Sequence, residues 1–73
     1  AYTDPNGLSH REIEVLILIV RGLTNKEIAD HLCIGTTTVI SHRKNIMEKL
    51  NVRSVSGLTI YAVMNGYIEA DRI

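Results

Sequence analysis

Five side chains between Thr37 and Asn45 have types and spacing suited to reading the edges of DNA bases. Thr37, Ile40, Ser41, Lys44 and Asn45 stand at positions i, i+3, i+4, i+7 and i+8, which places them on one face of an α-helix. Lysine can reach guanine O6 or N7, asparagine can pair with adenine, serine is versatile, and an aliphatic group can meet the thymine methyl. We therefore expect Ile40, Ser41, Lys44 and Asn45 to contact bases, provided that the stretch is helical.

Positive charge is concentrated in the same part of the chain, although the 73 residues together have a formal net charge of zero. Residues 36–53 hold four basic side chains against a single acidic one: Arg43, Lys44, Lys49 and Arg53 are the basic residues. A local basic patch is what binding to phosphates requires. The first helical turn, with Thr36, Thr37 and Thr38, adds free N–H groups and hydroxyls for a phosphate. We assign Thr36 and Arg43 to phosphate contacts on these grounds.

The elements that must position these side chains begin with one signal that occurs twice. In LSHREI and in LTNKEI, Ser9 and Thr24 are each followed three residues later by a glutamate, which is the pattern of a capping box flanked by a hydrophobic staple. The two signals predict helices over 10–21, ended by Gly22, and over 25–32.

A tight connection, Cys33-Ile34-Gly35, leads from the second helix into a longer helix over 36–50, which Asn51 can end. A short helix, a tight turn and a longer helix form the layout of a helix-turn-helix. Val39, Ile46 and Leu50 form the buried side of the longer helix.

A fourth helix is predicted over 54–65, with Ser54 as its cap and Gly66 after its end. Its inward stripe comprises Leu58, Tyr61, Ala62 and Val55. Tyr67 and Ile68 are expected to fold back onto the core, and residues 69–72 to form a last turn. The predicted fold is all-α, with a linker remnant over 1–7 and one tetrahelical domain over 8–73.

Two side chains invite a choice between a structural and a functional interpretation. Leu18 falls on the polar side of the first helix, and we interpret it as a surface leucine; the alternative is that it forms a partner surface with Ile17. Cys33 lies two residues from His31 and could be imagined in a metal site. Because structural zinc needs four ligands, we instead expect Cys33 to be a small buried hydrophobic residue, and we predict no metal.

Several classes of protein are disfavoured by the residues that are missing. The sequence has no Gly-rich phosphate loop, no bracketing carboxylate pair and no nucleophile with a matched base, so we predict neither an enzyme nor a cofactor. Its single cysteine excludes an internal disulfide and fits a reducing cytoplasm. No apolar run approaches the roughly 18 residues of a membrane span, so we expect a cytoplasmic protein without a membrane partner.

From Leu8 to Ile68 the chain resembles the LuxR/FixJ-type (GerE-like) helix-turn-helix family. Three ordered blocks carry the resemblance: LSHREIEVL, GLTNKEIA and TVISHRKNIMEKLNV. The resemblance implies a double-stranded DNA-binding output domain at the C-terminus of a bacterial transcription regulator, behind a receiver or ligand-sensing domain. A two-component response regulator is the kind of regulator we expect, with RNA polymerase as a further partner.

The resemblance also implies roles for individual residues. Base reading in the major groove falls to Ile40, Ser41 and Lys44. Phosphate contacts fall to Asn25, Lys26, Thr37, Thr38, His42 and Lys49. The fourth helix is the usual dimer surface, which gives Ile60, Val63 and Met64 a role in a weak homodimer on two half-sites about one helical turn apart.

Two departures from the family pattern remove basic side chains. The position of Ile40 is commonly lysine, and the position of Val55 is frequently basic. We expect weaker non-specific DNA binding than in a typical member, visible as a shallower dependence of log K on log salt.

Two other classes of protein remain as alternatives. A promoter-recognition domain of a sigma factor shares the helix-turn-helix but would bind polymerase core in a pull-down. A small helical protein-interaction module would not shift duplex DNA.

Overall fold

Four helices follow one another in the computed structural model, which describes residues 4–70. They are α1 (His10–Val20), α2 (Asn25–Leu32), α3 (Thr36–Leu50) and α4 (Val55–Met64). The described residues contain no strand, so the predicted all-α four-helix fold is confirmed. Within the same residues, no helix is both long enough and apolar enough to cross a membrane.

Both predicted capping boxes are present. The Ser9 hydroxyl accepts a hydrogen bond from the Glu12 N–H at 3.1 Å, and the Ser9 N–H donates to Glu12 Oε1 at 2.8 Å. Thr24 and Glu27 repeat the arrangement with the same two distances at the start of α2. Each box satisfies backbone N–H groups that have no partner within the helix, so these helix starts are fixed by local sequence.

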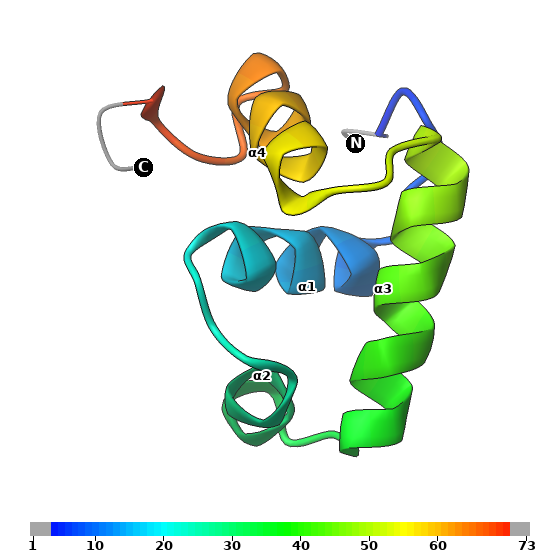
Figure 1. The fold of residues 1–73 in the computed structure, drawn as a ribbon, viewed down its shortest axis with the longest axis vertical. Coiled ribbons are helices and arrows are strands. Elements are labelled where there is room, and N and C mark those ends of the chain that lie inside the picture. The colour runs from blue at the N-terminus through cyan, green and yellow to red at the C-terminus, as the bar shows by residue number, and fades with distance from the viewer. Residues whose placement is uncertain (1–3, 71–73) are drawn as a thin grey trace.

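Helix α1 lies at the centre of the molecule, with α4 on one side and α2 on the other, and α3 runs crosswise to it beside the end at which α1 begins (Figure 1). It therefore buries more than one stripe: besides Val15, Leu16 and Ile19, Leu18 is only 8% exposed. The interpretation of Leu18 as a surface leucine was wrong. Helix α2 packs on the side of α1 that a helical wheel assigns to solvent, and Leu32 of α2 lines the same hollow as Leu18.

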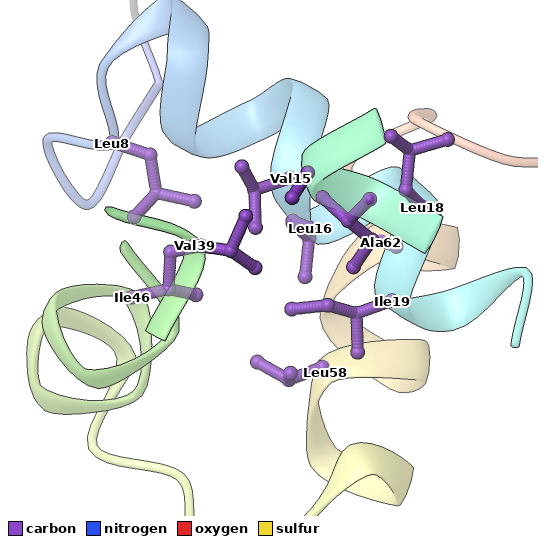
Figure 2. Packing of buried hydrophobic residues seen from close by; sticks show 11 residues of the cluster. Leu8, Val15, Leu16, Leu18, Ile19, Val39, Ile46, Leu58 and Ala62 are labelled. Carbon is purple, nitrogen blue, oxygen red and sulfur yellow. The ribbon is translucent and has the colours of Figure 1, made fainter. Parts of the chain in front are cut away.

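The core draws on every helix. Leu16, Ile28, Ile46 and Leu58, one from each helix in turn, are fully buried, and Figure 2 shows how the apolar side chains of the core converge. Burying a side chain of this size is worth about 1.5–3 kcal/mol. Tyr67 and Ile68 pack against this core as predicted. Because α3 contributes to the same core as α1 and α2, its orientation is fixed by packing rather than by the connecting turns.

Two helices end at a residue in the left-handed conformation. Asn51 (φ 54°) ends α3, as predicted, and Cys33 (φ 58°) ends α2. The Cys33 side chain is exposed, so the expectation of a buried hydrophobic residue was wrong. The left-handed backbone turns the chain at Cys33, just beyond the inward stripe that contains Ile28 and Ala29, and the thiol stays in solvent.

Helix α4 has the predicted N-cap, Ser54, whose hydroxyl accepts a hydrogen bond from the Gly57 N–H at 3.3 Å. Leu58 and Ala62 are fully buried and Tyr61 is half-buried. Val55 is 43% exposed, so its place in the inward stripe was wrong. It is the first residue of α4 and precedes the part of the helix that packs on α1.

The segment before α1 packs onto the helical domain through Asp4, which is 4% exposed. Its carboxylate accepts hydrogen bonds from the backbone N–H groups of Asn6 (2.8 Å) and Leu8 (3.2 Å). It also accepts hydrogen bonds from the hydroxyls of Tyr61 (2.8 Å) and Tyr67.

Asp4, within the stretch expected to be a linker, is held to the helical domain by hydrogen bonds from Tyr61 and Tyr67. Burial alone would raise the pKa of the Asp4 carboxyl, but the hydrogen bonds from Tyr67, Tyr61 and the backbone outweigh it and lower that pKa. Residues 1–3 of the expected linker, and residues 71–72 of the expected last turn, lie outside the described residues.

Candidate nucleic-acid interface

Helices α2 and α3 and the turn between them form a helix-turn-helix unit. The turn is closed by a hydrogen bond of 3.0 Å from the Ile34 N–H to the Ala29 carbonyl. Gly35 is the N-cap of α3 and gives it no side-chain cap. The N–H groups of the first turn of α3 therefore remain available to an external acceptor such as a phosphate oxygen.

The outward side of α3 carries the residues expected to read bases. Ile40, Ser41, Lys44 and Asn45 are all exposed, as is Thr37. On the opposite side Val39 and Ile46 are fully buried, and this packing fixes which face of α3 looks outward. The structure thus brings together, on one solvent-facing helix surface, the five side chains selected from their spacing.

Five of the residues expected to bind phosphate lie in the first turn of α3 or the first turn of α2. Thr36, Thr37 and Thr38 are exposed in its first turn, Lys26 is exposed on α2, and Asn25 is half-buried at the first position of α2. In Figure 1 the start of α3 and helix α2 occupy the same end of the molecule. Hydroxyls, backbone N–H groups and an ammonium group are therefore gathered at this end.

His42 and Arg43 lie apart from the outward face of α3. Both are half-buried. At 100° per residue they flank the stripe formed by Val39 and Ile46 rather than the face that carries Lys44. They can reach a phosphate only at the side of the helix.

Lys49 is placed differently from the other expected phosphate contacts, because its ammonium group forms an ion pair inside the domain. Lys49 Nζ lies 2.7 Å from Glu12 Oε1 and 3.2 Å from the Gly7 carbonyl oxygen. The Glu12 side chain is 6% exposed and that of Lys49 is 41% exposed. The contact joins the last turn of α3 to the first turn of α1.

The ion pair controls the ionisation of Glu12. Burial by itself would raise the pKa of the Glu12 carboxyl, but the Lys49 ammonium and the Ser9 backbone and side chain outweigh it and lower that pKa. Sequence reasoning missed this contact, although a signal was present. Glu12 stands three and four residues before the core residues Val15 and Leu16, and a carboxylate on a core face needs a partner.

The residues expected at a dimer interface lie on α4, which packs on the opposite side of α1 from α2 (Figure 1). Ile60 and Met64 are 60% and 80% exposed, and Val63 is half-buried. A shallow hollow of about 160 Å³ separates α1 and α2, lined by Glu14, Ile17, Leu18, His31 and Leu32. Among the described residues, no three His, Cys, Asp or Glu side chains are grouped to hold a metal ion.

Comparison with known proteins relates the sequence to bacterial regulatory proteins. It is 48% identical over 56 residues to the oxygen regulatory protein NreC of Staphylococcus carnosus, covering 77% of this chain and 26% of that protein. It is 53% identical over 53 residues to the uncharacterized response regulatory protein YgeK of Escherichia coli, covering 73% and 36%. It is 44% identical over 66 residues to the transcriptional regulatory protein MctR of Rhizobium johnstonii, covering 90% and 30%.

The chain thus spans about a quarter to a third of the length of these relatives. Residues 6–62 match the family described as bacterial regulatory proteins, luxR family. That match includes all of α1, α2 and α3 and most of α4. The chain belongs to the luxR family of bacterial regulatory proteins.

Proposed function

We propose that this domain binds specific sequences of double-stranded DNA by inserting α3 into the major groove. The observation that carries the proposal is the exposed face of α3, where Ile40, Ser41, Lys44 and Asn45 project away from the buried Val39 and Ile46. An α-helix fits the major groove, and these side-chain types can contact base edges there. Membership of the luxR family implies DNA-binding transcription regulation.

Phosphate contacts would set the register of α3 on the duplex. In the proposal, the N–H groups and hydroxyls of Thr36 to Thr38, together with Asn25 and Lys26 of α2, bind phosphates on one side of the groove. His42 and Arg43 contribute from the flank of α3. Lys49 belongs to this set only if a phosphate can compete with Glu12 for its ammonium group.

In the full-length regulator we propose that the domain works as a dimer. The exposed Ile60 and Met64, with Val63, would meet their counterparts in a second copy, and two copies of α3 would read half-sites about one helical turn apart. A receiver domain would precede the domain, as the similarity to response regulators suggests. The regulator would act in the cytoplasm, as a binding protein without a catalytic step or cofactor, and contact RNA polymerase.

The test is a titration of the domain against a randomised duplex pool at two salt concentrations, with the bound DNA sequenced. Enrichment of a repeated or palindromic motif, with binding that falls as salt rises, is the expected result. Absence of both enrichment and salt-sensitive binding would contradict the proposal. The matched control is Val39→Ala, which alters the buried side of α3 and should leave the enriched motif unchanged.

A further inference from the structure

One aliphatic side chain interrupts the otherwise polar outward face of α3. Ile40 is 52% exposed, and its neighbours on that face, Thr37, Ser41 and Lys44, are exposed and polar. The other large hydrophobic side chains that are exposed among the described residues all belong to α4. Ile40 is therefore not the edge of a larger apolar patch on α3.

The packing of α3 keeps Ile40 in solvent in the free domain. Val39 and Ile46 are fully buried on the inner side. A rotation of α3 that covered Ile40 would expose Val39, which fits the core. The apolar surface of Ile40 can thus be covered only by a binding partner. It is the fifth residue of α3, and the first turns of the second helix are the part of a helix-turn-helix that meets base edges.

We propose that Ile40 contacts the C5-methyl group of a thymine in the major groove, so that each half-site favours a methylated pyrimidine at one position. This inference rests on the proposed DNA binding and specifies the chemical group of the DNA that Ile40 recognises. An isoleucine side chain has no hydrogen-bond donor or acceptor, so it cannot distinguish the polar atoms of the bases. The thymine methyl is the apolar group that the major groove presents. Ser41 and Lys44 supply hydrogen bonds beside it.

The chemistry gives a direct test, because uracil is thymine without this methyl. In the duplex enriched from the pool, each thymine is replaced in turn by uracil, and the dissociation constant is measured for the original chain and for Ile40→Ala. One replacement per half-site should weaken the original chain about fourfold, since burying one methyl group is worth about 0.8 kcal/mol. Ile40→Ala should bind the thymine and uracil duplexes equally.

A second measurement adds the methyl group instead of removing it. With cytosine at the identified position, conversion to 5-methylcytosine should tighten binding of the original chain about fourfold and leave Ile40→Ala unchanged. Ser41→Ala is the matched control: it should bind more weakly but keep the preference for thymine over uracil. Thermal unfolding should show a nearly unaltered midpoint for Ile40→Ala, because only about half of the side chain is covered and alanine has a higher helix propensity than isoleucine.

Two failures can be told apart. A pool that yields no enriched duplex would overturn the proposed DNA reading and the methyl contact together. An enriched, salt-sensitive duplex in which no uracil replacement weakens the original chain would overturn the methyl contact alone. The same holds if Ile40→Ala retains a fourfold preference for thymine.

Discussion

At the scale of single residues, two lysines of α3 lie in different environments. Lys44 is exposed on the outward face, five residues before Lys49. The ammonium group of Lys49 is held by Glu12 and by the Gly7 carbonyl. Only a cation free to replace counterions on DNA contributes to the salt dependence of binding. The family resemblance treats Lys49 as a phosphate contact, whereas the structure gives it a partner within the domain.

Lys44→Ala should weaken binding to the enriched duplex by about 1–3 kcal/mol and relax the preference at one base pair, because a base contact is lost. Competition assays with duplexes altered at each position measure both effects. Lys26→Ala is the control: as a phosphate contact it should weaken all sequences alike. If Lys44→Ala binds the enriched duplex as tightly as the original chain, α3 is not the helix that recognises the base sequence.

Lys49→Met should lower the free energy of unfolding by about 1–2 kcal/mol, because the buried Glu12 carboxylate loses its partner. The figure lies below the roughly 3–5 kcal/mol typical of fully buried pairs, since Lys49 is partly exposed to solvent. Urea unfolding measures the loss. The control is Arg11→Met, which breaks an exposed pair with Glu14 and should cost less than about 0.5 kcal/mol.

Salt titrations separate this role from phosphate binding. The slope of log K against log salt should be the same for Lys49→Met as for the original chain. A slope reduced by about one, with stability unchanged, would instead identify Lys49 as a phosphate contact.

At the scale of helices, local signals in the sequence decided the outcome at most of the helix starts and at the end of α3. The capping boxes at Ser9 and Thr24, the cap at Ser54 and the left-handed Asn51 depend on neighbours a few residues away, and all were predicted. Leu18 could not be placed in this way. Its burial depends on how α2 packs against α1. A helical wheel of α1 alone carries no information about that packing.

Val39→Ala should cost about 2 kcal/mol, the transfer free energy of two methyl groups plus a small cavity. For a domain of this size the melting temperature should fall by about 8–16 °C. Thr37→Ala, on the exposed side of the same helix, is the control and should leave the melting temperature nearly unchanged. A similar fall in melting temperature for both variants would mean that the Val39 side of α3 is packed no more tightly than the Thr37 side.

At the scale of the whole molecule, two buried carboxylates join segments that are distant in the sequence. Asp4 connects the segment before α1 to Tyr61 and Tyr67, and Glu12 connects α1 to α3. Neither long-range contact was predicted, because it requires knowing which helices become neighbours. The pKa of each carboxyl is lowered in the folded chain. The unfolded chain therefore binds more protons in acid, and stability is lost as the pH falls.

Asp4→Asn should reduce the free energy of unfolding at about pH 7 by about 1–3 kcal/mol, because charge-assisted hydrogen bonds are lost. The difference from the original chain should begin to shrink near pH 3.9, where the Asp4 carboxyl of the unfolded chain takes up a proton, and should be lost as the pH falls through the lower pKa of the folded chain. Urea unfolding at several pH values tests this expectation. A difference that stays constant with pH would show that the charge of Asp4 is not what stabilises the fold.

The hydrogen bonds of Asp4 also determine how a neighbouring module could be tethered. In a longer protein that carries this domain, the flexible part of a tether would end at Asp4, because hydrogen bonds hold Asp4 to Tyr61 and Tyr67 and hold Gly7 to Lys49. Four residues of extended chain would reach about 13 Å. Removing that length from a tether raises the effective concentration of whatever is attached to it. A single buried carboxylate can thereby set how often a tethered module meets this domain.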